Sequence, residues 1–137
     1  MDYVAFEIFS DLEYRNDEGT LVVRWPNANF AILRCSVNSI FRKGVEVVEA
    51  AEREVAELAR KANTSYDRVG EKFEFRTQKP SSEDPSSTVY YWYIGLGGHI
   101  AVVSVFVDYR FANDERTKRV LDCADLLVQS FRRAENA

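Results

Sequence analysis

Histidine and cysteine are scarce in this chain. Its 137 residues include one histidine, His99, and two cysteines, Cys35 and Cys123. A zinc site normally needs about four nitrogen or sulfur ligands, and these three residues are far apart in the sequence. We therefore expect no metal site and no other cofactor.

Recognisable catalytic signatures are missing as well. No Gly-x-Ser-x-Gly or comparable element is present, so the sequence offers no nucleophile with an associated base and orienting acid. Cys35 lies in a predicted strand rather than at the start of a helix, where its thiol would be activated. His99 follows two glycines and is interpreted as a polar hairpin residue. These observations favour a protein that is not an enzyme.

The chain also lacks an excess of basic charge and a long apolar segment. It has 18 Lys and Arg against 22 Asp and Glu, a formal charge of −4, whereas nucleic-acid binders usually show a basic stripe. The longest apolar run, residues 100–107, is interrupted by Ser104 and is far shorter than the roughly 20 residues of a membrane-spanning helix. The first residues do not have the pattern of a signal peptide. We therefore expect an acidic, cytoplasmic protein that binds neither nucleic acid nor membranes.

The two cysteines fit a cytoplasmic protein. Cys35 sits in the apolar pattern of a predicted strand and Cys123 in that of a predicted helix. Free, buried thiols in a reducing compartment are the favoured interpretation. A disulfide between the two remains an alternative at this stage, because the sequence alone does not reveal pairing.

What the chain does contain is typical of one globular domain. Hydrophobic residues make up 46% of it and charged residues 29%, which is the balance of folded proteins. A chain of this length buries roughly two-thirds of its unfolded surface, enough for one core. No internal repeat is visible, so we treat residues 1–137 as a single domain.

Hydrophobic periodicity predicts the secondary structure. Alternation predicts strands, and apolar steps of three and four predict helices. The predicted strands are residues 4–8, 20–25, 30–37, 72–77, 88–96 and 99–109; the predicted helices are residues 44–62, with a stop at Asn63, and a last helix capped by Asn113 or Asp114. Residues 16–19 have turn chemistry, and residues 78–87 are predicted to form a mobile loop. The order βββαβββα predicts an α+β domain in which two helices pack on a mostly antiparallel sheet of about six strands.

The last two predicted strands form a hairpin about Gly97-Gly98, because a two-residue turn needs positive φ. This turn pairs Tyr93 with Val102 and Tyr91 with Ser104. One face of the hairpin is then wholly apolar and must be core, while the other is apolar with polar interruptions. Because both faces are largely apolar, we expect cover on both sides of the sheet.

Two segments carry a family resemblance. Residues 17–26 (DEGTLVVRWP) form a turn, a strand, an aromatic residue and a proline, and the last helix ends with VQSFRR at residues 128–133 after Tyr109 and a polar turn. These features resemble the PsbP-like α/β/α fold family, although Asn27-Ala28-Asn29 stands where that family usually has Gly-Trp after the proline. The resemblance implies an antiparallel sheet between helices and no shared catalytic set.

Two groups of residues are candidates for binding. The first 19 residues hold six acids against one arginine, and such a negative patch can steer a basic protein partner; a solvated loop is the simpler alternative. In the second group Tyr91 and Tyr93 share the less apolar hairpin face with polar residues, and tyrosine is common at interfaces; packing beneath a helix is the alternative. The candidate residues are Asp11, Glu13, Asp17 and Glu18 in the first group, and Tyr91, Tyr93, His99, Ser104 and Asp108 in the second.

Two functional hypotheses follow from the sequence. The first is a non-catalytic protein-binding module, such as a small acidic immunity, adaptor or chaperone-like protein, with a homodimer as one form of it. The second is a small-ligand-binding protein, or an enzyme without a recognisable motif. Its pocket would lie between helix and sheet and be lined by Tyr91, Tyr93, His99 and Asp108.

Overall fold

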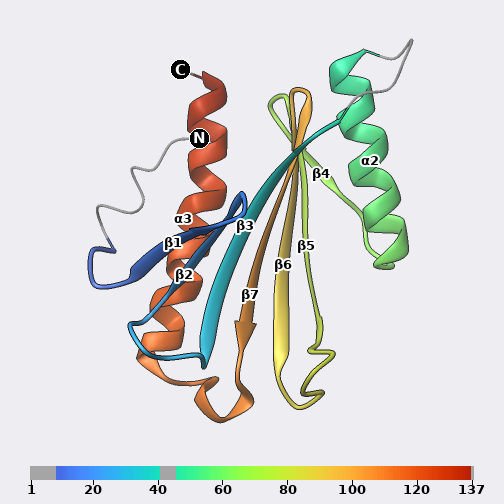
Figure 1. The fold of residues 1–137 in the computed structure, drawn as a ribbon. Helices are drawn as coiled ribbons and strands as arrows, with labels where there is room; N and C mark the ends of the chain where they lie inside the picture. Colours follow the sequence, from blue (N-terminus) through green and yellow to red (C-terminus); the bar gives the residue numbers. More distant parts are fainter. Residues whose placement is uncertain (1–8, 41–45, 137) are drawn as a thin grey trace.

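Seven strands form one antiparallel sheet in the order β1-β2-β3-β7-β6-β5-β4 (Figure 1). The computed structural model describes residues 9–40 and 46–136, apart from the side chains of residues 47–48 and 132–136. The strands are β1 (Glu13–Asp17), β2 (Thr20–Arg24), β3 (Ala31–Ser39), β4 (Asp67–Val69), β5 (Lys72–Pro80), β6 (Thr88–Leu96) and β7 (His99–Val107). The helices are α2 (Val47–Lys61), α3 (Glu115–Asn136) and the short 3-10 turn η1 (Tyr109–Phe111).

The predicted α+β class is confirmed, and the described residues form seven strands where about six were predicted. The strand expected over residues 4–8 lies outside the described residues. Two strands were not predicted, β1 and β4, and both lie at an edge of the sheet. An edge strand buries little, so its sequence shows no apolar alternation: four of the five residues of β1 are exposed.

The turn residues act as the sequence predicted. Gly97 has a φ of +59°, which a residue with a side chain adopts only under strain. The hairpin then pairs Tyr93 with Val102 and Tyr91 with Ser104, confirming the predicted register. Asn63, with a φ of +54°, ends α2, and the N–H of Thr64 donates to the Ala59 carbonyl at 3.0 Å.

The start of α3 also follows local chemistry. Asp114 precedes its first turn, and the Oδ1 atom of Asp114 accepts a hydrogen bond from the Arg116 N–H at 2.8 Å. Of the two predicted capping residues, Asn113 and Asp114, it is therefore Asp114 that caps α3. In the part of the chain that the structure describes, neither helix combines the length and the apolar character needed to cross a membrane.

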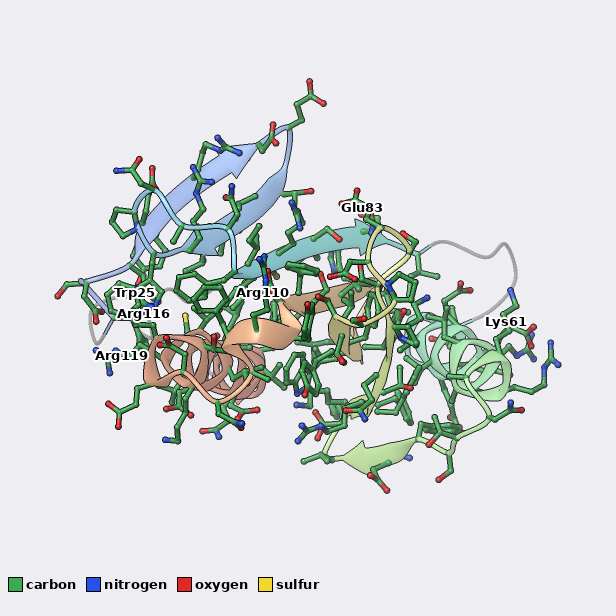
Figure 2. All side chains as sticks on the ribbon, turned by 90° about the horizontal axis from the view of Figure 1, so that it is seen from below. Trp25, Lys61, Glu83, Arg110, Arg116 and Arg119 are labelled. Carbon is green, nitrogen blue, oxygen red and sulfur yellow. The ribbon has the colours of Figure 1, made fainter. Side chains whose placement is uncertain are left out.

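Helices α2 and α3 lie on opposite faces of the sheet (Figures 1 and 2). The larger core lies between α3 and the sheet and includes Leu33, Val103, Val105 and Leu127, all fully buried. Cys35 and Cys123 lie in this core as free thiols, as predicted, and they are not joined in the alternative disulfide.

The smaller core lies beneath α2, on the opposite face of the sheet. Ala51, Val55 and Ala59 of the helix pack there on Phe73, Phe75 and Ile100 of the sheet. The cover expected on both faces is therefore present, although α2 covers only part of its face.

Gly95 lets α2 approach the sheet closely. A Cβ atom at this position would lie 2.8 Å from the Cγ2 atom of Val55 and 3.1 Å from the backbone oxygen of Ala51. Both separations are shorter than an ordinary van der Waals contact, so only glycine allows this helix-to-sheet distance without a shift of α2.

Candidate functional site

The sheet face that carries α2 continues beyond the end of that helix. There, the side chains of Ile32, Val89, Tyr91 and Phe106 are only half-buried. They line a groove of about 590 Å³, which we call the open groove; its lining residues are Asn29, Ile32, Arg34, Ser81, Ser82, Glu83, Val89, Tyr91, Ser104, Phe106 and Asp108.

Sheet register places these side chains together. Ile32 of β3 pairs with Phe106 of β7, which pairs with Val89 of β6. In the next row Arg34 pairs with Ser104, and Ser104 with Tyr91. Because alternate residues of a strand share a face, the two rows form one continuous surface with an apolar row beside a polar one.

The loop of residues 81–87 forms one wall of the open groove. The N–H of Ser81 donates to the Ser87 carbonyl at 2.9 Å, and the Ser87 hydroxyl donates to the Asp84 carboxylate at 2.8 Å. The predicted loop over residues 78–87 is shorter than expected, because β5 continues to Pro80. Figure 2 shows Glu83, in this loop, on the side of the sheet away from Arg116 and Arg119 of α3 and from Trp25, which lies beside that helix.

Asp108 closes one end of the open groove. Its Oδ1 atom accepts a hydrogen bond from the Arg110 N–H at 3.0 Å, and its Oδ2 atom lies 2.7 Å from Arg110 Nη2. The side-chain hydrogen bond from Arg110 is the main cause that lowers the pKa of Asp108, followed by the backbone hydrogen bond. Asp108 is therefore an ionised carboxylate whose charge is largely offset by Arg110.

A second groove of about 420 Å³ lies between the end of α2 and β5, and Tyr91 lines both grooves. The rings of Tyr91 and Tyr93 stack at 5.8 Å between centroids, and Tyr93 stacks in turn on Phe75 at 4.8 Å. The Lys79 Nζ atom lies 4.9 Å from the Tyr91 ring centroid, in a cation-π contact. The pKa of Tyr93 is raised, first by burial and then by the neighbouring Tyr91.

The structure brings most of the predicted tyrosine-face residues together, with one exception. Tyr91, Ser104 and Asp108 line the open groove, and Tyr93 lies beside Tyr91 in the second groove. His99 is exposed at the first position of β7, whereas Asp108 follows the last. The pocket predicted to combine all four of Tyr91, Tyr93, His99 and Asp108 is therefore divided, and His99 belongs to neither groove.

The predicted acidic residues are dispersed and mostly paired with arginine. Asp11 lies 3.2 Å from the Nε atom of Arg119, Glu13 lies 3.6 Å from the Nε atom of Arg24, and Asp17 lies 3.9 Å from the Nη2 atom of Arg15. Glu18 is exposed in the β1–β2 turn. The arginines reduce the negative potential expected from the sequence.

A third cleft, of about 240 Å³, lies between α3 and the β4–β5 edge. None of its lining residues was among the predicted binding residues; they are Asp67, Glu74, Phe75, Arg76, Trp92, Ile94, Asp125, Val128 and Gln129. Beside it, Lys72 is fully buried and forms an ion pair with Glu74. Alternation along the strand predicted over residues 72–77 places Lys72, Glu74 and Arg76 on one face, and only the position of α3 shows that this charged face is partly covered.

The described residues offer little for nucleophilic or metal chemistry. Burial raises the pKa of both Cys35 and Cys123 to about 12, so both thiols are protonated at neutral pH. No group of three or more His, Cys, Asp or Glu residues that could hold a metal ion occurs within residues 9–40 and 46–136.

Comparison with known proteins supports the fold alone. No protein-family model and no curated protein matches the sequence. A crystal structure of a protein from Bacteroides thetaiotaomicron VPI-5482 is similar, with a TM-score of 0.54 and 18% sequence identity. The similarity covers 82% of this chain but only 40% of that one, so the present chain corresponds to less than half of the other protein.

Proposed function

We propose that the protein is a non-catalytic module that binds another protein through the open groove. The observation that carries this proposal is the half-buried apolar row of Ile32, Phe106 and Val89, next to Tyr91, on a face where α2 has ended. Aromatic and apolar side chains bordered by polar groups are typical of protein interfaces. Immunity, adaptor and chaperone-like proteins are the classes in which we place it.

The charges around the open groove refine the expected partner. The acidic residues near the N-terminus are largely paired with arginines, so they give weak support to a basic partner. Arg34 is exposed in the polar row and has no ion-pair partner among the described residues. We therefore favour a partner segment that places apolar side chains on the apolar row and a carboxylate beside Arg34.

Small-ligand binding is the second candidate. The open groove has a volume within the range of roughly 300–1,000 Å³ that such sites occupy. Its four apolar lining residues are nevertheless half-exposed, whereas small-molecule sites usually enclose most of the ligand surface. The PsbP-like resemblance remains a proposal about ancestry, and a sheet between two helices is compatible with it.

Site-specific photo-crosslinking in cells tests the proposed function. A photoreactive amino acid at Val89 or Ser104 lies in the open groove, and the same group at Glu57, on the exposed side of α2, is the matched control. We expect a discrete protein adduct from the two groove positions and none from Glu57. In the purified complex, Arg34→Glu should weaken binding at least tenfold without changing the melting temperature.

Other outcomes would count against protein binding. Equal crosslinking from Glu57 and the groove positions would reject the groove as the site. A small molecule retained in native mass spectrometry, and lost on Tyr91→Ala, would favour the second candidate. An adduct of two copies of this chain would instead support protein binding and would identify the partner as a second copy of the chain.

A further inference from the structure

β5 has an open edge along its second half. β4 pairs only with Lys72, Phe73 and Glu74, the first three residues of β5. β5 continues to Pro80 and pairs with β6 along its whole length on the other side. In the described part of the chain no strand lies beyond residues 75–80, and Figure 1 shows β4 next to the first part of β5 only.

The alternation of an antiparallel ladder identifies the free peptide groups. Val69 and Lys72 pair across a two-residue turn, so the closing pair exchanges both backbone hydrogen bonds and Lys72 directs its peptide groups toward β4. Residues two apart point the same way, which directs the N–H and C=O groups of Arg76 and Gln78 to the open edge. Pro80 is next in this series and lacks an N–H, so it ends the row of donors.

Clefts of different charge lie on the two sides of this edge. On the α3 side, the third cleft is lined by the carboxylates of Asp67 and Asp125, neither of which has an ion-pair partner among the described residues. On the α2 side, the second groove is lined by Lys61 and Lys79 together with Tyr91. The α3 side also carries Arg76, whose guanidinium lies 5.5 Å from the Trp92 ring centroid.

A strand added to this edge would reach both clefts. Successive side chains of a strand point to opposite faces, so side chains of the added strand would alternately enter the third cleft, which is acidic, and the second groove, which is basic. Strand addition gains affinity from main-chain hydrogen bonds and specificity from the pockets that receive alternate side chains. The edge thus has free backbone groups and a charge pattern that distinguishes one class of peptide from others.

We propose that an extended segment of a partner protein pairs with β5 beside Arg76 and Gln78. The segment continues the line of β4 and carries charges that alternate in sign. Its basic side chains face Asp67 and Asp125, and its acidic side chains face Lys61 and Lys79. This inference rests on the proposed function, because it assumes a protein partner, and it adds a second contact site and the chemistry of the bound segment.

Two synthetic peptides of one composition test the inference. The first is acetyl-KEKEKEK-amide, in which charges alternate, and the second is acetyl-KKKKEEE-amide, in which they are separated. In a titration of the isotope-labelled full chain followed by NMR, the alternating peptide should shift the backbone amides of Arg76 and Gln78. The block peptide should bind at least fivefold more weakly. Equal affinities of the two peptides would overturn the proposed charge pattern.

Two variants at one position isolate the backbone contact. Gln78→Pro removes an outward N–H, whereas Gln78→Ala removes the same side chain and keeps the N–H. We expect Gln78→Pro to weaken binding of the alternating peptide at least tenfold and Gln78→Ala to change it less than threefold. Equal binding to both variants would overturn the added strand.

A modified peptide provides the same test without a variant. Methylation of alternate backbone nitrogens of the alternating peptide removes the donors along one of its edges. Each of the two alternate methylation patterns leaves the donors of one edge intact, so we expect both of these peptides to bind. Methylation of all the backbone nitrogens should abolish binding. Binding by the fully methylated peptide would overturn the added strand even if Gln78→Pro did not fold.

The two proposals fail in different ways. A partner complex that is lost on Arg34→Glu and unchanged on Gln78→Pro would leave the open groove as the binding site and reject the added strand. A complex lost on Gln78→Pro and unchanged on Arg34→Glu would reject the open groove and support the added strand.

Discussion

The two faces of the sheet both carry apolar side chains, but these side chains are exposed to different degrees. Val103 and Val105 of β7 point to the α3 face and are fully buried, whereas Val102 and Phe106 of the same strand point to the α2 face and are half-buried. The difference comes from the helices, because both sets of residues are apolar. An apolar strand face predicts that something covers it, and the length and position of the covering element decide how much.

Helix length accounts for the unequal cover. The 22 residues of α3 extend about 33 Å at 1.5 Å per residue, and the 15 residues of α2 extend about 22 Å. A nine-residue strand such as β7 is about 30 Å long. α3 therefore matches the length of the strands, and α2 leaves one end of its face open.

The largest expected effect contrasts one core residue with one groove residue. Leu127 of α3 is fully buried in the larger core, so Leu127→Ala should lower the free energy of unfolding by about 3–4 kcal/mol. Val89→Ala, in the open groove, should lower it by less than about 1 kcal/mol. Urea unfolding measures both values.

A second valine completes this comparison. Val105→Ala is the same substitution as Val89→Ala, on the neighbouring strand but on the buried face. Its cost should fall between those of the other two variants. Equal losses for Val105→Ala and Val89→Ala would mean that the open groove is covered in solution, for example by a second copy of the chain.

The next effect concerns the buried charge on the α3 face. Lys72 is fully buried and pairs with Glu74. Glu74→Ala leaves this ammonium without its carboxylate and should cost about 3 kcal/mol. Lys72→Met removes the buried charge and should cost clearly less. If Lys72→Met cost as much as Glu74→Ala, the ion pair itself would be a net source of stability.

A smaller effect tests how closely α2 is held on the other face. Gly95→Ala places a methyl group 2.8 Å from the Val55 side chain and should cost about 1–3 kcal/mol. Val55→Ala removes the obstructing atom, so the double variant should lose less than the sum of the two single losses. Additive losses would show that the backbone oxygen of Ala51, at 3.1 Å, is the decisive contact.

The fold was predictable where local chemistry determines it. Gly97 supplies the positive φ that a two-residue turn needs, and this turn fixes the register of Tyr91 and Tyr93. Asn63 ends α2 in a left-handed conformation. The edge strands β1 and β4 were not predictable, because charged or very short strands carry no apolar alternation. Their existence depends on pairing with a neighbouring strand.

The candidate site was predictable in part. Alternation placed Tyr91 and Ser104 on one face, but it could not show that α2 stops short of them. The sequence also gave no sign that Lys72 would be buried or that Arg34 would stand beside Ser104, since both facts depend on contacts between distant segments. His99 was grouped with the tyrosines on chemistry. It lies at the opposite end of β7 from Asp108, and alternation along the strand places it on the α3 face with Val103 and Val105.

The smallest effect on stability at neutral pH concerns the thiols. Burial raises the pKa of Cys35 from 9.0 to about 12 in the folded state, so folding favours the protonated thiol. This contribution is fully present below pH 9 and is lost as the pH rises from 9 toward 12. A Cys35→Ser variant should therefore show a weaker loss of stability across that range than the parent chain.

Thiol labelling turns the same property into a comparison of the two faces. At pH 8, Cys35 should react with a thiol reagent only as fast as the protein unfolds, because it lies in the α3-side core. A cysteine introduced by Ser104→Cys lies in the open groove and should react at a rate close to that of a free thiol. Slow reaction at position 104 would mean that this groove is closed in solution. Fast reaction at Cys35 in a chain that still unfolds cooperatively would mean that the α3-side core opens locally without global unfolding.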